Sequence, residues 1–317
     1  METGKILITG GAGFIGSHVA EALLKQGENI VIIDDFNDYY NPAWKRENIK
    51  EIKKHAAVYE ADIRDEQALD TIFKKEKFGS IIHLAARAGV RPSIKDPILY
   101  QEVNIGGTHN VLEAARKHDI QNLILSSSSS VYGNQKKTLF SEDDRVDNPI
   151  SPYAATKRAM ELLAHVYYHL WGLNIACLRF FTVYGERGRP DMAPYLFTEK
   201  ILRGEEIQKF GDGTSRRDYT YVGDIVEGIV RCLDKKFGYE IINLGNNNPI
   251  SLNKFIETLE EITGKKAKIQ EMPMQEGDVE VTYADISKAK KILGWEPHVS
   301  FEEGIKRFVE WYKAERM

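Results

Sequence analysis

Short hydrophobic runs alternate with amphipathic stretches along much of the chain. The runs are rich in isoleucine, leucine and valine, and the segments between them carry apolar residues at helical spacing. Such alternation is typical of a mostly parallel sheet that is covered by helices on both faces. The predicted strands are Lys5–Thr9, Asn29–Ile33, Ala57–Glu60, Ser80–Leu84, Asn122–Ser126, Ile175–Phe180 and Glu240–Leu244.

The pattern changes after about Thr182, where Asp191–Arg203 and Ser251–Thr263 are predicted helices joined by shorter polar connections. We therefore expect an α/β chain in which a doubly wound parallel sheet is followed by a smaller mixed α/β domain. The chain is expected to return to the first domain through Tyr219–Leu244 before it leaves again. The predicted ranges are 1–182 and 216–247 for the first domain, and 183–215 and 248–317 for the second.

The composition suits a globular protein with one large core or two smaller ones, because 42% of the 317 residues are hydrophobic and 28% are charged. No run reaches the roughly 20 apolar residues of a membrane span, and the first residues lead into a strand and not into a signal peptide, so we expect a cytoplasmic protein with no membrane partner. The net charge of −4 is spread along the chain, which gives no wide basic face for nucleic acid. Cys177 and Cys232 lie in apolar surroundings and are expected to be buried, without a disulfide.

A glycine-rich turn follows the first predicted strand. Gly10 permits a tight turn, Gly13 lets the backbone approach a pyrophosphate, and Gly16 lets the next helix pack closely on the sheet. That helix, Ser17–Gln26, would offer the free N–H groups of its N-terminus to the phosphates. Strand, glycine turn and helix in this order predict a Rossmann-type domain that binds a dinucleotide.

An acidic residue supports this interpretation and selects the cofactor. Asp34 ends the second predicted strand 18 residues after Gly16, near the roughly 20 expected for a carboxylate that binds ribose hydroxyls. A carboxylate repels a 2′-phosphate, and the first arginine beyond it is Arg46, so NAD is favoured over NADP. The predicted cofactor site also includes Phe14, Ile15 and Asn37, Asp62 and Ile63 for the adenine, and the small-residue passage of Leu84, Ala85 and Ala86.

Tyr153 and Lys157 lie four positions apart in a predicted helix, and therefore on the same helix face. Ser151 is a plausible N-cap, Pro152 suits the first turn, and Gly172 would end the helix. A phenol with a pKa near ~10 is a poor base at neutral pH, and lowering that pKa by about three units needs about 4 kcal/mol. The neighbouring ammonium and the positive nicotinamide ring of NAD⁺ can supply this stabilisation.

Five consecutive serines, from Ser126 to Ser130, end the fifth predicted strand. The carboxyl edge of an α/β sheet is where ligands bind, so a serine there can bridge a substrate hydroxyl and Tyr153. The alternative is a polar loop with local hydrogen bonds between side chain and backbone, which is common in serine runs and especially plausible for Ser127.

Four motifs together resemble the extended short-chain dehydrogenase/reductase family, specifically its nucleotide-sugar epimerases and dehydratases. They are Thr9–Gly16, His83–Ala86, Tyr153-x-x-x-Lys157 and Arg179–Gly185. The resemblance implies an NAD-binding first domain and a second domain that binds a nucleotide sugar. It assigns Ser128 as the catalytic hydroxyl, Tyr153 as the base and Lys157 as its electrostatic partner. It also assigns Asn104 to support of the catalytic region, Ser126, Phe180 and Val183 to the cofactor, and Thr182 to the sugar.

Narrower stretches look like UDP-glucuronate 4-epimerases, namely Ala88–Ser93, Phe181–Ala193 and Met274–Val279. The resemblance implies NAD-dependent interconversion of UDP-glucuronate and UDP-galacturonate through a transient 4-keto sugar. Related dehydratases carry an Asp-Glu pair where this chain has Ser129 and Ser130, and related decarboxylases carry a glutamate at the position of Ser130. Glu186 departs from the usual proline of the uronate epimerases. A 4-epimerase of UDP-glucose or UDP-N-acetylglucosamine and a UDP-glucuronate decarboxylase remain the alternatives.

An acidic sugar needs hydrogen-bond donors, which Ser128, Ser129, Ser130 and Thr182 could provide. Arg91, Arg189 and Arg217 are candidates for the uronate or the pyrophosphate, although each could equally be a solvated surface residue. The family resemblance favours Arg217 for the UDP phosphate and Asp278 for the uridine ribose, and Ala88 joins the predicted substrate site. It also implies a homodimer formed through the Tyr153 helix and Ile105–His118, and we expect no metal site.

Overall fold

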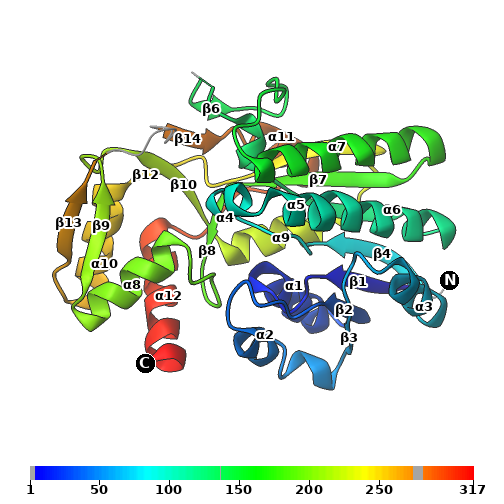
Figure 1. The fold of residues 1–317 in the computed structure, drawn as a ribbon, viewed down its shortest axis with the longest axis horizontal. Helices are drawn as coiled ribbons and strands as arrows, with labels where there is room; N and C mark the ends of the chain where they lie inside the picture. Colours follow the sequence, from blue (N-terminus) through cyan, green and yellow to red (C-terminus); the bar gives the residue numbers. More distant parts are fainter. Residues whose placement is uncertain (1–3, 136, 274–280) are drawn as a thin grey trace. The chain divides into compact units, whose positions relative to one another are not determined.

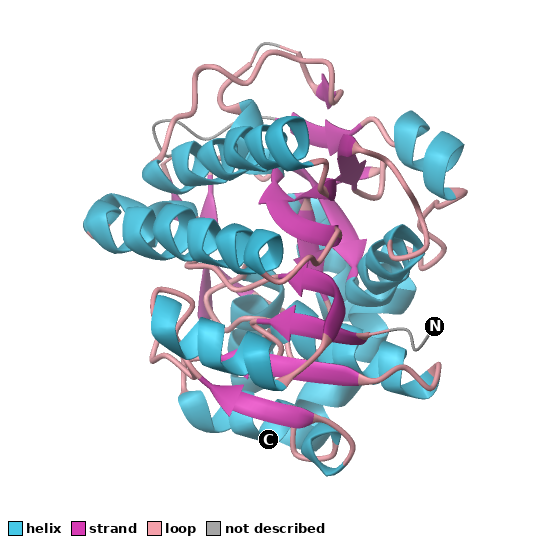
Figure 2. Ribbon diagram, turned by 90° about the vertical axis from the view of Figure 1, so that its right-hand side faces the viewer, coloured by secondary structure: helices cyan, strands magenta, loops and turns pink. Residues whose placement is uncertain are grey.

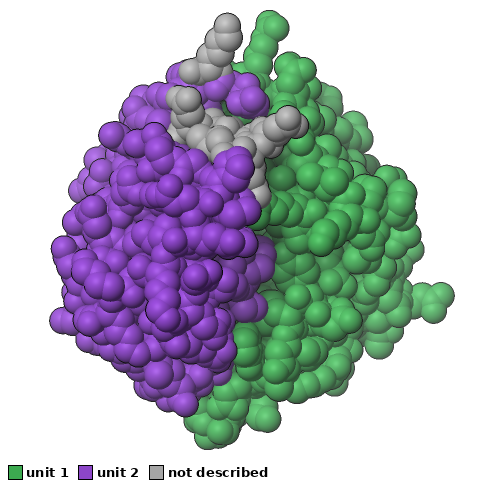
Figure 3. All heavy atoms as spheres, turned by 60° about the vertical axis from the view of Figure 1, so that its left-hand side comes forward, with its two compact units in different colours: residues 1–133, 142–180, 226–243 green, residues 134–141, 181–225, 244–317 purple. Residues whose placement is uncertain are grey.

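The computed structural model describes residues 4–135, 137–273 and 281–317 (Figures 1 and 2). The chain forms two compact units, which are coloured separately in Figure 3. Unit 1 comprises Met1–Gly133, Glu142–Phe180 and Val226–Asn243, and unit 2 comprises Asn134–Ser141, Phe181–Ile225 and Leu244–Met317.

A 7-stranded sheet forms the centre of unit 1, with the order β11-β7-β5-β4-β1-β2-β3. The chain builds one half outward from β1 to β3, returns to the middle at β4, and builds the other half outward to β11. The strand order therefore reverses between β1 and β4, which is the switch point where open α/β sheets bind ligands. The strands are β1 (Lys5–Thr9), β2 (Ile30–Asp34), β3 (Ala57–Glu60), β4 (Phe78–His83), β5 (Asn122–Ser128), β7 (Asn174–Phe180) and β11 (Tyr239–Leu244). The prediction of a doubly wound, Rossmann-type parallel sheet is confirmed.

Helices cover both faces of this sheet (Figure 2). Leu7 and Val31 belong to a buried cluster with side chains of α3, α6 and α7, whereas alternate residues such as Ile8 and Ile32 point to the opposite face. The elements between the strands are α1 (Phe14–Lys25), α2 (Pro42–Asn48), α3 (Glu66–Lys75), α4 (Val90–Lys95), α5 (Pro97–Gln101), a π-helix (Glu102–Gly107), α6 (Thr108–Lys117) and α7 (Pro152–Trp171), with 3₁₀ turns at Ile52–Lys54 and Ser129–Tyr132. The helix α9 (Val222–Cys232) runs from unit 2 into unit 1.

The helix α7 begins and ends as its sequence predicts. Ser151 accepts a hydrogen bond from the Ala154 N–H at 3.1 Å, which satisfies one of the free donors of the first turn. Pro152 occupies the first helical position, and Gly172 ends the helix in the left-handed conformation with φ of 70°. Both cysteines are buried as predicted.

Unit 2 contains a mixed sheet with the order β12-β10-β14-β6, in which β8 also pairs with β10, and a separate parallel pair of β9 and β13. Its aromatic core includes Tyr219 stacked on Phe255 at 5.3 Å, with Phe301 packed beside both rings. The elements are β6 (Leu139–Phe140), β8 (Thr182–Tyr184), α8 (Ala193–Arg203), β9 (Glu206–Phe210), β10 (Arg216–Tyr221), β12 (Pro249–Ser251), α10 (Leu252–Thr263), β13 (Lys268–Met272), β14 (Val281–Ala284), α11 (Ser287–Leu293) and α12 (Phe301–Arg316). The two helices predicted here are confirmed as α8 and α10.

The predicted domain ranges gave residues 134–141, 181–182, 216–225 and 244–247 to the first domain, whereas all four segments belong to unit 2. The reason is strand pairing, since β6 pairs with β14 and β10 pairs with β8, β12 and β14. The assignment of a dinucleotide to one domain and a nucleotide sugar to the other remains a prediction. Within the described ranges, no helix is both long enough and apolar enough to cross a membrane.

Candidate active site

The glycine turn lies against the loop that follows β4. Gly10 has a φ of +69°, and a Cβ there would lie 2.7 Å from the Ala85 nitrogen. A Cβ at Gly16 would lie 2.1 Å from the Gly10 oxygen, so only glycine fits where α1 meets the turn. At Gly13 a Cβ would meet only the Gly10 oxygen, at 3.2 Å. The turn is therefore closed on the protein side at Gly10 and Gly16 and open at Gly13, as a pyrophosphate site at a helix N-terminus requires.

Asp34 is buried at the carboxyl end of β2 and organises the loop beyond it. Its carboxylate accepts the N–H of Ala12 at 3.0 Å and that of Phe36 at 2.9 Å. Burial raises the pKa of Asp34, and both N–H groups and the Lys45 ammonium oppose that rise. Lys45 is itself buried and donates to the carbonyl oxygen of Asn37 at 2.8 Å. The sequence analysis missed Lys45, because a lysine in a short polar helix looks like a surface residue.

Two other charged residues of the predicted adenosine region already have partners. The Arg46 guanidinium lies 4.3 Å above the Phe36 ring and binds Glu60 at 2.8 Å. Asp62 accepts two hydrogen bonds from the Arg64 guanidinium, at 2.9 and 2.6 Å. A 2′-phosphate would have to displace Glu60 from Arg46 to use that cation, which agrees with the preference for NAD.

The end of β4 is held by a buried chain of neutral hydrogen bonds. His83 contacts the Thr9 hydroxyl at 2.7 Å through Nδ1 and the Thr108 hydroxyl at 2.9 Å through Nε2. Burial and the Lys157 cation lower the pKa of His83 to about 3, so the ring is neutral. The Thr9 hydroxyl also accepts the N–H of Ala85 at 3.3 Å. These contacts place Leu84, Ala85 and Ala86 beside the glycine turn.

Asn104 ties the same loop to α7. It lies in the π-helix, a wide turn that is often found at functional sites. Its amide oxygen accepts the N–H of Arg87 at 2.8 Å, and its Nδ2 donates to the Arg87 oxygen and to the Thr156 hydroxyl, each at 3.0 Å. The Thr156 hydroxyl donates to the backbone carbonyl oxygen of Tyr153 at 2.8 Å. Asn104 thus links the loop to the first turn of α7.

Tyr153 is positioned by two residues that the sequence analysis did not select. Its backbone N–H donates to the Ser93 hydroxyl at 3.1 Å. Its ring meets the Tyr100 ring edge to face, with centroids 6.2 Å apart. Tyr100 in turn donates to the Ala88 oxygen at 2.5 Å. Only the family stretch around Ala88–Ser93 gave a signal for this region.

Lys157 lies one helical turn beyond Tyr153 and is 4% exposed. Its ammonium donates to the Ser126 carbonyl oxygen at 2.6 Å and lies 3.4 Å from the Ser126 hydroxyl. Burial lowers the pKa of Lys157 to about 8, which still leaves the group mostly cationic at neutral pH. A buried ammonium held by neutral oxygens can stabilise a nearby phenolate.

The sequence left two interpretations open for the serine segment, Ser126–Ser130: a catalytic hydroxyl, or a polar loop with local hydrogen bonds. The contacts of its residues differ in this respect. Ser128 donates to the Ser130 hydroxyl at 3.1 Å and accepts the Ser130 N–H at 3.2 Å. Ser127 instead donates to the Glu161 carboxylate of α7 at 2.6 Å. Ser129 begins the 3₁₀ turn and is partly buried. Local bonds therefore exist, and they leave Ser128 and Ser130 adjacent at the end of β5.

Two further residues of unit 1 were predicted to bind the cofactor or the substrate. Phe180 is the buried last residue of β7, and Arg91 is an exposed residue of α4. In unit 2, Thr182 and Val183 lie on β8 and pair with Tyr219 and Thr220 of β10. Asp278 lies outside the described residues.

The arginines predicted in unit 2 also have local partners. Arg189 binds both carboxylate oxygens of Asp191, at 2.9 and 2.5 Å, so a substrate carboxylate would compete with Asp191. Arg217 lies on β10 and donates to the Arg216 oxygen at 3.0 Å.

Glu186, the departure from the usual proline, accepts the Tyr221 hydroxyl on both oxygens, at 2.9 and 2.8 Å. Burial and this carboxylate raise the pKa of Tyr221 to about 12.

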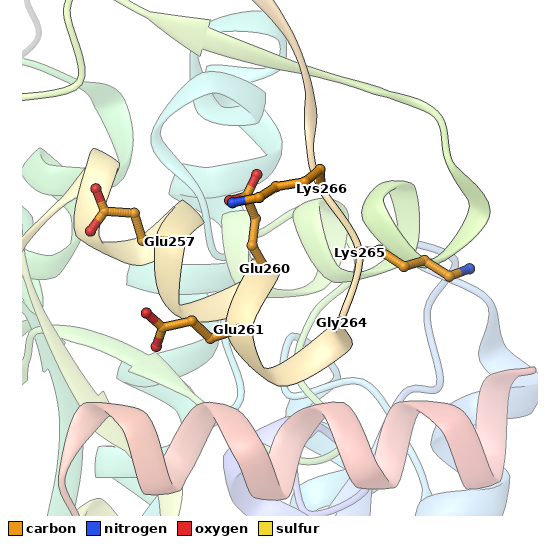
Figure 4. A pocket seen from close by; sticks show the side chains of 6 residues that line it. All are labelled: Glu257, Glu260, Glu261, Gly264, Lys265 and Lys266. Atoms are coloured by element: carbon orange, nitrogen blue, oxygen red, sulfur yellow. The ribbon is translucent and has the colours of Figure 1, made fainter.

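A hollow at the C-terminal end of α10 contains none of the predicted site residues (Figure 4). It is lined by Glu257, Glu260, Glu261, Gly264, Lys265 and Lys266.

The sequence and the fold of the chain were compared with those of known proteins. The family model described as GDP-mannose 4,6 dehydratase matches residues 7–308. Over 313 residues the chain is 50% identical to a UDP-glucuronate 4-epimerase of Thermodesulfobacterium geofontis, covering 98% of this chain and 96% of that one.

Two crystal structures share the fold across almost their whole length. A Bacillus cereus UDP-glucuronic acid 4-epimerase in complex with UDP-glucuronic acid and NAD is 38% identical, with a TM-score of 0.91 and coverage of 98% of this chain and 99% of that one. A Thermotoga maritima UDP-glucose 4-epimerase with UDP-glucose is 36% identical, with the same TM-score and the same coverage. The chain therefore belongs to the GDP-mannose 4,6 dehydratase family of extended short-chain dehydrogenases/reductases.

Proposed function

We propose that this protein is an NAD-dependent isomerase that interconverts UDP-glucuronate and UDP-galacturonate at C4. The observation that carries the proposal is the 50% identity, over nearly the whole chain, with a UDP-glucuronate 4-epimerase. The Bacillus cereus enzyme, which holds UDP-glucuronic acid and NAD, supports the same substrate and cofactor.

The residues present fit NAD. The glycine turn is open at Gly13, and the first N–H groups of α1, at Phe14 and Ile15, are available to a pyrophosphate. The buried carboxylate of Asp34 suits the adenosine ribose hydroxyls. When bound, NAD⁺ supplies the hydride acceptor for C4 and returns the hydride to the opposite face, so that no net redox change occurs.

The protein's own residues move the proton. Tyr153, as phenolate, takes the proton of the C4 hydroxyl, and Ser128 bridges the two oxygens. The Lys157 ammonium stabilises the phenolate, and it is held in place by Ser126. The resulting 4-keto uronate is a β-keto acid that loses carbon dioxide readily, so the carboxylate must be held while the ring turns over. Tyr153 then returns the proton to the oxygen.

The hydroxyls of Ser129 and Ser130 argue against the other reactions of the family. Neither position carries the acidic residue that a dehydratase or a decarboxylase of this family has there, so the chain lacks the side chains that accompany elimination of water and loss of carbon dioxide in those relatives. A second candidate is a UDP-glucose 4-epimerase, which the similarity to the Thermotoga maritima enzyme favours. The mechanism would be the same, and only the group at C6 would differ.

The test is to incubate the purified protein, without added NAD, with UDP-glucuronate and separately with UDP-glucose, and to identify the products by NMR. UDP-galacturonate without UDP-pentose supports the proposal and shows that the cofactor stays bound. Product from UDP-glucose alone would favour the second candidate, and UDP-pentose would show decarboxylation. The matched control is Tyr153→Phe, which should retain NAD and lose turnover.

We also propose a homodimer formed through α7 and α6. Leu162, Val166 and Leu170 are 53%, 43% and 58% exposed, and they repeat every four residues along α7. Such an apolar stripe on a helix is typical of a surface that is covered by another chain. Light scattering after size exclusion measures the mass, and a monomer at micromolar concentration would contradict the dimer. The cytoplasmic location stays a prediction from the sequence.

A further inference from the structure

A buried ion pair lies inside unit 1 behind the serine segment. Glu161 of α7 is 0% exposed and Arg179 of β7 is 1% exposed. The guanidinium binds both carboxylate oxygens, with Nε to Oε1 at 2.8 Å and Nη2 to Oε2 at 2.9 Å. Arg158 adds a third contact to Oε2 at 3.1 Å. Burial of two ions is costly, and this pair has the two-pronged geometry that offsets the cost.

The ion pair is hydrogen-bonded to Ser127, near the middle of the serine segment. The Ser127 hydroxyl donates to Glu161 Oε1 at 2.6 Å, and Ser127 is the register partner of Arg179 across β5 and β7. Ser126 and Ser128 flank this anchor. Ser126 holds the Lys157 ammonium, and Ser128 is the proposed proton bridge. A shift of Ser127 would therefore move both functional neighbours.

The far end of the segment is held by the same arginine. The Arg179 guanidinium lies 4.8 Å from the centre of the Tyr132 ring, which belongs to the 3₁₀ turn after the serines. The Tyr132 hydroxyl donates to Asn243 Oδ1 of β11 at 2.7 Å. Burial raises the pKa of Tyr132, so the hydroxyl stays protonated and remains a donor.

The Glu161 carboxylate lies on the same face of α7 as Tyr153 and Lys157. Tyr153, Lys157 and Glu161 follow one another at intervals of four residues and share one helix face. Two other titratable groups that interact with Lys157 are neutral at pH 7, because burial raises the pKa of the Cys177 thiol of β7 and lowers that of the His83 ring of β4. The charges in this part of unit 1 are the Glu161 carboxylate and the guanidinium groups of Arg158 and Arg179 that bind it. Cys177 and Glu161 both oppose the effect of burial on the pKa of Lys157, and of these two only Glu161 is charged at pH 7.

We propose that Glu161 and Arg179 are positioning residues for the reaction: their ion pair fixes Ser126 and Ser128 against α7 and keeps a negative charge one turn from Lys157. This inference rests on the proposed epimerase function for its kinetic test. It has a second test that does not depend on substrate.

The kinetic test compares Ser127→Ala with Ser80→Ala. Ser127→Ala removes the anchor while both charges stay, and kcat should fall about tenfold with KM within about twofold, because a hydrogen bond to a charged group is lost. Ser80 accepts a hydrogen bond from Asn122 at the opposite end of β5, at 3.2 Å, so Ser80→Ala is the matched control and should keep the wild-type kcat. A wild-type kcat in Ser127→Ala would overturn the anchoring role.

The second test measures the pKa of Lys157 by NMR in ¹³C-lysine-labelled protein, with Lys157→Met to assign the signal. In Glu161→Gln the pKa should fall below the wild-type value, and the alkaline limb of kcat should move to lower pH with it. An unchanged pKa would overturn the electrostatic role. If Glu161→Gln does not fold, the kcat of Ser127→Ala still decides the anchoring role. If the wild type has no epimerase activity, the proposed function fails, while the NMR titration still tests this inference.

Discussion

Gly16→Ala should destabilise the folded protein even without cofactor. The new methyl carbon would lie 2.1 Å from the Gly10 oxygen and 2.8 Å from the Gly11 Cα, both of which are backbone atoms that cannot rotate away. Since α1 or the turn must move, we expect a cost of about 3 kcal/mol, the upper part of the usual range for overpacking. For a chain of this length that corresponds to a Tm lower by about 4–5 °C.

The matched control is Gly13→Ala, in the same turn. Gly13 has a φ of −72°, and its new methyl would meet only the Gly10 oxygen at 3.2 Å, so the cofactor-free Tm should stay within about 1 °C of wild type. The methyl would instead occupy the open side where a pyrophosphate approaches. Added NAD at about 100 times its Kd stabilises the wild type by about 2.7 kcal/mol, and Gly13→Ala should lose most of that gain.

The assay is thermal unfolding, followed by circular dichroism, of protein freed of dinucleotide and then of the same protein with added NAD. Comparing the two conditions separates a change in the fold from a change in cofactor affinity. A cofactor-free Tm of Gly16→Ala equal to that of wild type would refute the packing argument. A full NAD-dependent gain in Gly13→Ala would refute the placement of the pyrophosphate.

Three further outcomes are expected. Burial lowers the pKa of Lys157 to about 8, so the ammonium is present below that pH and lost above it. We therefore expect kcat, measured from about pH 6 to about pH 10, to fall on the alkaline side. A flat profile would contradict the role of this charge. Asn104→Ala leaves the Arg87 amide and carbonyl without their partner, and should lower the free energy of unfolding by about 3 kcal/mol in denaturant titration and also lower kcat. Arg189→Ala should impair turnover of UDP-glucuronate more than any turnover of UDP-glucose in parallel assays, and equal losses would remove the carboxylate assignment.

The elements of unit 1 could be predicted closely because buried parallel strands are continuous apolar runs. The observed β1 and β3 have the predicted ends, and α7 has the predicted caps. Unit 2 was predicted less completely. Strands such as β6, with two residues, and β8, with three, are defined by their partners and not by their own pattern.

The site shows the same division between local and distant signals. The glycine turn, Asp34, Tyr153 and Lys157 stand at fixed spacings within one element or its neighbour, so the sequence alone could select them. Lys45, Ser93, Tyr100 and Arg179 could not be selected in this way, and Glu161 has the spacing but not the buried partner that gives it a role. Their roles depend on partners that are far away along the chain, as Ser93 is from Tyr153, and a single buried charge leaves no periodic pattern.

Under the proposed mechanism, the groups that transfer the proton and the groups that select the sugar have different structural origins in this chain. In unit 1, the ammonium of Lys157, the backbone of Tyr153 and the serine segment are all fixed by hydrogen bonds among residues of that unit. These contacts join residues of unit 1 to one another, so under the proposed mechanism they would serve a sugar with either a hydroxymethyl or a carboxylate group at C6. Positions outside these hydrogen bonds are then candidates for sugar selectivity. Besides Arg189, they include Ser129, which belongs to the serine segment while its hydroxyl takes no part in the bonds that fix Ser127 and Ser128.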